Sequence, residues 1–140
     1  MRVVLDTSVV IAGLRSRHGA ASVVLDAVTE LRLQVVATPA IFLEYEEVLK
    51  RPEQKLEHGL DDASVDAFLA ALARVVEPVQ IYFHWKPQLS DPNDEIFSEP
   101  AISGTARAVI THNVRDFGNL RKGFGIEVLT PKEILWRINK

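Results

Sequence analysis

Residues 2–8 read RVVLDTS, an apolar run that ends in an acid and two hydroxyl side chains. A short, continuously apolar run is typical of a strand that is buried on both faces of a parallel sheet. Similar runs recur at residues 33–37, 79–83, 108–111 and 126–129. Helical patterns separate them, at residues 20–31, 39–51, 61–75 and 94–103, and another follows residue 130. We therefore predict an α/β fold, a mainly parallel sheet flanked by helices.

Local signals mark where some of these elements begin. Thr38 precedes Pro39, a combination that predicts an N-cap followed by proline in the first helical turn. Residues 130–133 read TPKE, which predicts a capping box at the start of the last helix. Pro52 and the polar residues up to Gly59 predict a loop.

Length and composition set limits on the class of protein. A chain of 140 residues predicts one domain spanning residues 1–140. The absence of cysteine excludes disulfides and thiolate metal sites. No apolar run approaches the roughly 20 residues of a membrane span, and the first residues do not resemble a signal peptide. We therefore expect a cytoplasmic protein without membrane contact.

The net charge of −3 argues against a general nucleic-acid coat protein, because such proteins usually carry a basic surplus. Removing four acids into one metal site would leave the rest of the chain at +1. Basic stretches also exist: Arg15 and Arg17 lie in a segment without acids, and Arg121 and Lys122 lie in another. Local binding of nucleic acid therefore remains open.

Polar side chains follow two of the predicted strands. Asp6 comes directly after the first strand, while Thr111 ends a later one, with Asn113 and Asp116 just beyond. Ligand sites of open α/β sheets lie at the carboxyl ends of their strands. We therefore expect these polar groups to gather along one edge of the sheet.

Each candidate acid also has an ordinary structural interpretation. Asp6 is well placed to cap the following helix. Glu44 lies at the edge of an apolar helical arc, beside Ile41 and Val48, where it is either a functional acid or a border glutamate reaching solvent. Asp94 could interact with a helix dipole. Asp116 could be a turn residue.

Four acids gathered at one edge would be more specific than any one of them. Carboxylates that repel each other need a counter-charge. Without cysteine, Mg²⁺ or Mn²⁺ is the natural choice, because hard cations prefer oxygen ligands. Such ions polarise phosphodiesters and activate water.

The same residues resemble the PIN-domain family, in particular the toxin components of bacterial and archaeal toxin–antitoxin pairs. The resemblance covers nearly the whole chain. Its motifs are VVLDTS at residues 3–8, LEYEEVL at 43–49, DPNDEIF at 91–97, ITHNVRDF at 110–117 and VLTPKEIL at 128–135. Taken in order, these motifs are specific, although none is specific alone.

The resemblance implies a ribonuclease that depends on Mg²⁺ or Mn²⁺, often forms a homodimer and is silenced by an antitoxin protein. By position, the metal-holding acids would be Asp6, Glu44 and Asp94, with Asp116 as a more variable fourth. Ser8, Thr111 and Asn113 occupy places where the family orients its site. We expect a group of basic residues to guide the RNA: Arg15, Arg17, Arg115, Arg121 and Lys122. Apolar candidates for a dimer surface are Ile81, Phe83 and Trp85.

Two departures from the family pattern concern the region of the site. Pro100 lies inside the helix that carries Asp94, where it predicts a kink or an early end. His112 stands where small residues are usual. Helix geometry favours Asp94 over Glu95 as the third acid, because Phe97, Pro100 and Ala101 form the predicted buried face and Glu95 lies on another flank with Glu99.

Other functions fit the sequence less well. A phosphotransfer receiver domain needs a second acid after its first strand and a late lysine, and a dinucleotide-binding domain needs a glycine-rich first turn. The chain has neither pattern. The remaining alternative is a PIN-like module that binds nucleic acid or protein without cleaving it. A titration with Mg²⁺ or Mn²⁺ would separate the two.

Overall fold

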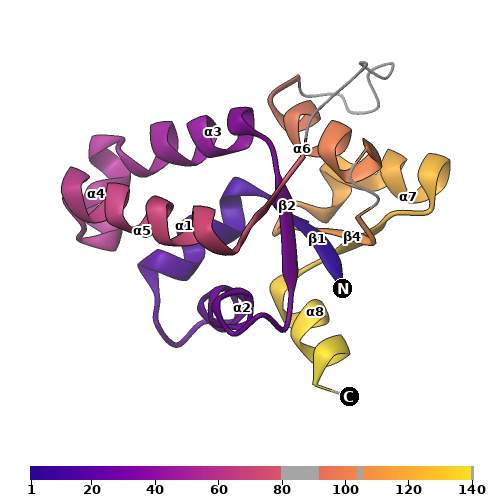
Figure 1. The fold of residues 1–140 in the computed structure, drawn as a ribbon, viewed down its shortest axis with the longest axis horizontal. Coiled ribbons are helices and arrows are strands. Elements are labelled where there is room, and N and C mark those ends of the chain that lie inside the picture. Colours follow the sequence, from indigo (N-terminus) through magenta and orange to yellow (C-terminus); the bar gives the residue numbers. More distant parts are fainter. Residues whose placement is uncertain (80–91, 104–105, 140) are drawn as a thin grey trace.

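A parallel sheet in the order β3-β2-β1-β4-β5 runs through the computed structural model (Figure 1). Its strands are β1 (Arg2–Leu5), β2 (Gln34–Ala37), β3 (Glu77–Pro78), β4 (Ala108–Ile110) and β5 (Glu127–Leu129). Every strand pair is parallel, which confirms the predicted α/β class. The structure describes residues 1–79, 92–103 and 106–139, without the side chains of 92–95, 99, 103 and 121–123.

Helices cover both faces of the sheet. They are α1 (Thr7–Arg15), α2 (Ala20–Thr29), α3 (Pro39–Leu49), α4 (Pro52–His58), α5 (Asp62–Val75), α6 (Pro92–Ser103), α7 (Gly118–Phe124) and α8 (Pro131–Ile138), with a 3-10 turn, η1 (Val114–Phe117). Helix α6 packs against β1, β2 and β4, on the side away from α2 and α8 (Figure 1). In the described part of the chain, no helix is long and apolar enough to cross a bilayer.

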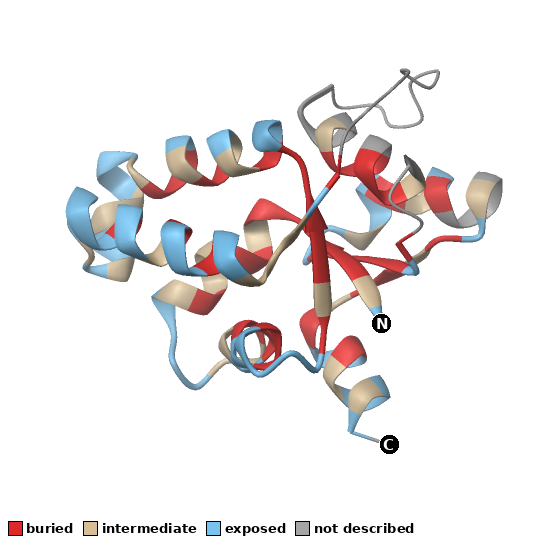
Figure 2. Cartoon of the chain, in the orientation of Figure 1, coloured by how far each residue is buried: buried red, intermediate tan, exposed pale blue. Residues whose placement is uncertain are grey.

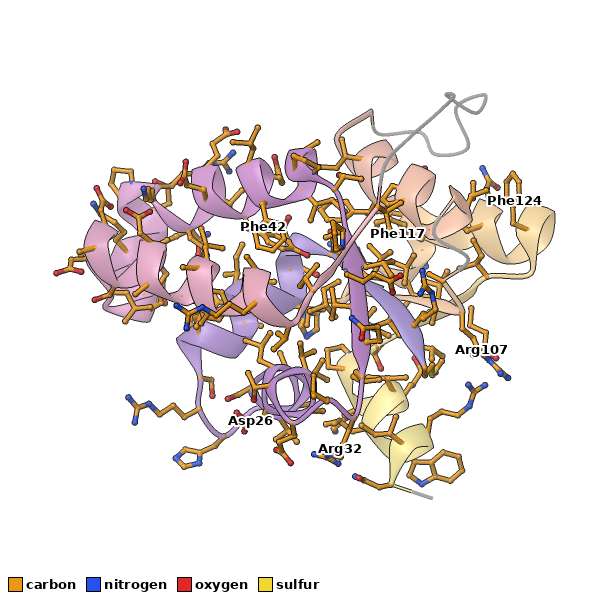
Figure 3. The ribbon with its side chains drawn as sticks, in the orientation of Figure 1. Asp26, Arg32, Phe42, Arg107, Phe117 and Phe124 are labelled. Carbon is orange, nitrogen blue, oxygen red and sulfur yellow. The ribbon has the colours of Figure 1, made fainter. Side chains whose placement is uncertain are left out.

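The core lies along the strands and the inward faces of the helices (Figure 2). Strands β1, β2 and β4 are almost wholly buried, as their continuous apolar character predicts. Phe42 and Phe117 lie toward the interior in Figure 3, whereas Asp26 projects from the outer side of α2. This apolar centre fixes the positions of the strand ends, and therefore of the side chains that follow them.

Helices α1 and α2 pack closely around Gly13. A Cβ atom at this position would lie 2.5 Å from the Leu25 side chain and 3.2 Å from the Ala21 carbonyl oxygen. The missing side chain therefore lets the two helices approach, and this contact holds the helix that follows Asp6.

The structure corrects two sequence-based expectations. Residues 52–58 form helix α4 rather than a loop, with Pro52 at its first position and Gly59 as a left-handed C-cap at φ 73°. Strand β3 lies at Glu77–Pro78, just before the predicted range of 79–83; Val79 is not part of it, and the prediction for residues 80–83 falls outside the described part. The proline is tolerated because β3 is an edge strand.

The predicted helix starts are confirmed. Thr38 accepts a hydrogen bond from the Ile41 N–H, and Thr130 forms a complete capping box with Glu133. Helix α6 continues through Pro100 to Ser103, so it does not end early at the proline. Phe97, Pro100 and Ala101 are buried, as predicted for the inward face of α6.

Candidate active site

Strand register brings Asp6 and Thr111 together. Leu5 pairs with Ile110 at the ends of β1 and β4, and Asp6 and Thr111 are the residues that directly follow them. The Asp6 N–H donates to the Ile110 carbonyl at 2.9 Å, and the Thr111 N–H donates to the Leu129 carbonyl at 2.9 Å. Two polar side chains that are 105 positions apart in sequence are therefore neighbours at the carboxyl edge of the sheet.

The Asp6 carboxylate is held by two hydroxyl groups. Ser8 Oγ donates to Asp6 Oδ2 at 2.8 Å, and Thr111 Oγ1 donates to the same oxygen at 2.7 Å. The Asp6 side chain is only 5% exposed. Its Oδ1 has no hydrogen-bond partner among the described residues. One carboxylate oxygen is thus fixed by the protein while the other is available to a ligand.

Backbone N–H groups fix the direction of both hydroxyls. The His112 N–H donates to Ser8 Oγ at 3.2 Å, and the Asn113 N–H donates to Thr111 Oγ1 at 2.9 Å. Each hydroxyl accepts one of these hydrogen bonds and therefore directs its own O–H toward Asp6 as a donor. Asn113 therefore contributes its backbone here, and its side chain is exposed.

The geometry decides against helix capping as the role of the Asp6 carboxylate. Asp6 occupies the N-cap position of α1 with φ −67° and ψ 150°, but its side chain makes no capping hydrogen bond. The carboxylate turns to Ser8 and Thr111 instead. An acid that is buried at a strand end and oriented by hydroxyls is arranged to bind something beyond its own helix.

Glu44 lies near Asp6, at the margin of the core. It is half-buried on α3, while Ile41, Tyr45, Val48 and Leu49 from the same helix are buried, as the predicted arc requires. Burial and the Glu47 carboxylate raise the pKa of Glu44, and the Asp6 carboxylate raises it further, against an opposing effect of Arg51. Glu44 and Asp6 therefore repel each other electrostatically.

Tyr45 has a positioning role that the sequence did not reveal. Its hydroxyl donates to the Leu5 carbonyl at 2.6 Å, which ties α3 to the residue before Asp6. Burial and the nearby Asp6 carboxylate raise the pKa of Tyr45, so its hydroxyl stays protonated. The available signal was the apolar arc itself, because a buried tyrosine hydroxyl normally needs a hydrogen-bond partner.

The structure describes the backbone of Asp94 but not its side chain. Asp94 lies in the first turn of α6, one turn before Phe97. The Phe97 ring lies 6.5 Å from the Tyr45 ring, centroid to centroid. The first turns of α6 thus approach the part of α3 that carries Glu44, and the choice of Asp94 over Glu95 stays a prediction.

Asp116 differs from Asp6 in its exposure to solvent. It lies in η1 and is exposed, as is Arg115 beside it. Among the residues that the structure describes, no three acids or histidines are grouped closely enough to hold a metal ion. The structure brings Asp6, Ser8 and Thr111 into contact and sets Glu44 nearby, and the part of Asp116 in the site stays a prediction.

The structure describes the side chains of some, but not all, of the basic residues predicted to bind RNA. Arg15 and Arg17 are both exposed, Arg15 in the last turn of α1 and Arg17 just after it. Arg15 lines a pocket together with Ser8, so it lies on the same side of α1 as the site. Arg121 and Lys122 belong to α7, but their side chains lie outside the described part.

The donor set fits a hard divalent cation. Asp6 offers a carboxylate oxygen that has no partner among the described residues, and Glu44 offers a second carboxylate whose ionisation is opposed by Asp6. A cation between them would relieve that repulsion. Oxygen donors of this kind suit Mg²⁺ or Mn²⁺.

Comparison with known proteins identifies the family. A family model described as PIN domain matches residues 2–115. Among solved structures, the chain is similar to one in the crystal structure of VapBC2 from Rickettsia felis bound to a DNA fragment from their promoter. That match has a TM-score of 0.57 and 13% identity, and covers 93% of this chain and 98% of that chain. A search of curated proteins gave no significant match. With the family model matching most of its length, the chain belongs to the PIN domain family.

Proposed function

We propose that this chain is an endoribonuclease that depends on Mg²⁺ or Mn²⁺. The observation that carries the proposal is the Asp6 carboxylate, which is buried, oriented by two hydroxyls and left with one free oxygen. Membership of the PIN domain family supports the same reading. The proposed metal ligands are Asp6, Glu44, Asp94 and Asp116, all within a single domain over residues 1–140.

The residues of the chain would act mainly by positioning. A bound divalent cation would supply a Lewis acid for the phosphodiester and lower the pKa of water. Ser8 and Thr111 keep the Asp6 carboxylate from rotating away, since both hydroxyls donate to the same oxygen. Tyr45 fixes the spacing between α3 and β1, and hence the place of Glu44 relative to Asp6. Holding such groups in advance lowers the reorganisation that the reaction requires.

We further propose that the protein is the toxin of a toxin–antitoxin pair. The ordered motifs resemble toxin components, and the fold is shared with a chain of VapBC2. A cognate antitoxin protein would be the partner, with RNA as the substrate. A homodimer and a cytoplasmic location belong to the same proposal; its apolar candidates, Ile81, Phe83 and Trp85, lie outside the described part of the structure.

Cleavage of labelled single-stranded and structured RNA tests the enzymatic proposal. We expect internal cuts with Mg²⁺ or Mn²⁺ and none in EDTA. Cleavage that persists in EDTA would contradict the metal-dependent mechanism. A protein that binds neither metal nor cleaves RNA would instead support the alternative of a non-catalytic binding module.

The third acid can be tested separately. Asp94→Asn should abolish cleavage and weaken Mn²⁺ binding, whereas Glu95→Gln, a matched change one residue later, should preserve both. The opposite pattern would show that Glu95 holds the metal and that the helix is rotated by about 100° from the predicted geometry.

A further inference from the structure

A small pocket adjoins the candidate active site. It has a volume of about 330 Å³ and is lined by Ser8, Ile11, Ala12, Arg15, Gln54 and His112. This volume lies at the low end of the range of roughly 300–1,000 Å³ for ligand sites. Because Ser8 also donates to Asp6, the pocket borders the residue on which the proposed chemistry depends.

One face of α1 forms the floor of the pocket. Ser8, Ile11, Ala12 and Arg15 follow the spacing i, i+3, i+4 and i+7, which places them on one side of a helix. Helix α4 packs against α1 and supplies Gln54, while His112 follows β4. Along α1 the pocket thus runs from Ser8, which is hydrogen-bonded to Asp6, to the exposed Arg15; their backbone positions are about 10 Å apart along the helix axis at 1.5 Å per residue.

Gln54 is the most informative of these residues. Its Oε1 atom is buried and has no hydrogen-bond partner among the described residues. A buried polar atom without a partner costs stability. The protein would lose no hydrogen bond at Oε1 if the amide turned into the pocket to meet a ligand.

The other residues that line the pocket indicate the chemistry of the ligand that it would bind. Ile11 and Ala12 provide an apolar surface, and the exposed Arg15 provides a positive charge at one end. His112, which departs from the family pattern, is exposed at the edge of the pocket and offers a planar ring. An apolar floor, an amide, a planar ring and a cation together match a nucleotide, with its flat base and its phosphate.

We propose that this pocket is a subsite for one nucleotide of the RNA, next to the scissile phosphodiester. The Gln54 amide pairs with the edge of the base, His112 packs on the base, and Arg15 binds a flanking phosphate. The inference rests on the proposed ribonuclease function and extends it, because it gives the enzyme a contact with one base and therefore a source of sequence preference.

Equilibrium binding of a short single-stranded RNA in EDTA, followed by fluorescence anisotropy, tests the subsite apart from catalysis. The probe set includes oligonucleotides that lack one base at a time. We expect the loss of one particular base to weaken binding to the wild type by about tenfold, the order expected for a bidentate amide–base contact. Gln54→Leu should bind the intact RNA about tenfold more weakly and lose the dependence on that base.

Leu56→Gln is the matched control, since Leu56 lies on the same helix and is 87% exposed. It should bind RNA as the wild type does. Gln54→Leu should also keep or raise the melting temperature, because the atom removed has no protein partner. A fall in melting temperature with unchanged affinity would overturn the subsite and show a structural role.

The outcomes separate this inference from the proposed function. If the wild type binds and cleaves RNA but Gln54→Leu binds equally well, the subsite is wrong and the pocket is left to other ligands, such as a side chain of a protein partner. If the wild type binds RNA without cleaving it in Mn²⁺, the ribonuclease proposal fails. The base contact is still tested, because the RNA affinities of the wild type and Gln54→Leu can be compared. If the wild type binds no RNA, both fail.

Discussion

Asp6 and Asp116 both follow strands of the same parallel sheet, yet their surroundings differ. Asp6 comes directly after β1, is buried and receives hydrogen bonds from two hydroxyls. Asp116 comes six residues after β4, lies in a 3-10 turn and is exposed. Asp6, which adjoins a buried strand, is thus oriented by the sheet, whereas Asp116 is an exposed side chain on a 3-10 turn. We expect the two to differ in function accordingly.

The largest effect on stability in this comparison should come from Thr111→Val. The change removes the donor to Asp6 and leaves the Asn113 N–H without its acceptor. We expect the free energy of unfolding to fall by about 1–3 kcal/mol and cleavage to fall by roughly 10–100-fold, as for other residues that orient metal ligands. Urea denaturation and RNA cleavage measure the two effects.

Thr29→Val is the control for that change. Thr29 is exposed, and its hydroxyl donates only to the Asp26 carbonyl within the same helix. It should alter stability by less than about 0.5 kcal/mol, the range of ordinary surface substitutions. Equal stabilities of Thr111→Val and the wild type would show that the hydroxyl network does not hold Asp6.

Asp116→Asn should have a smaller effect. An exposed acid outside the hydroxyl network can be replaced within about 0.5 kcal/mol of unfolding free energy. We expect cleavage to decrease but remain measurable, because Asp116 would contribute to metal binding without orienting Asp6. If Asp116→Asn were as inactive as a variant of Asp6, exposure in the free protein would be a poor guide to the site.

Glu44→Gln should produce the smallest effect on stability, visible in the pH dependence of the free energy of unfolding. The folded protein raises the pKa of Glu44 above the ordinary value of 4.5, mainly through burial. Ionised Glu44 therefore costs folding free energy at pH values above its folded pKa, and this cost disappears below pH 4.5. Glu44→Gln should be slightly more stable than the wild type at pH 7, by less than about 1 kcal/mol because solvent screens a half-exposed group.

Thermal unfolding of both proteins at pH 7 and pH 4 measures this difference. The advantage of Glu44→Gln should vanish at the lower pH. It should also shrink at pH 7 when Mn²⁺ is added, because a bound cation would stabilise the wild-type carboxylate. A variant that is less stable than the wild type at pH 7 without metal would contradict the repulsion between Glu44 and Asp6.

Much of the fold could be predicted because burial determines it. The strand at Arg2–Leu5 and the helix from Pro39 carry apolar patterns that match their surroundings in the structure. Pro52 and the polar residues after it predict a loop where the structure has helix α4. The position of Pro52 before a helix that ends at Gly59 is the usual placing of proline at the start and glycine at the end. Short helices without buried residues leave no apolar pattern to detect.

The candidate site was predictable where it depends on strand register. Asp6 and Thr111 end adjacent parallel strands, and that geometry alone brings them together. Sequence could not decide whether Asp6 caps its helix, because capping and metal binding use the same residue type at the same position. The unpartnered oxygen of Gln54 could not be predicted from the sequence either, because it depends on how α4 packs against α1.

Asp6→Asn tests the central claim most directly, with Asp26→Asn as the control. Asp26 is an exposed acid on the outer side of α2 (Figure 3). Added Mn²⁺ should raise the melting temperature of the wild type and of Asp26→Asn, as ligand binding to the folded state does, and both should cleave RNA. Asp6→Asn should remain folded, its melting temperature should not rise when Mn²⁺ is added, and it should leave the RNA intact. Undiminished cleavage by Asp6→Asn would contradict the account.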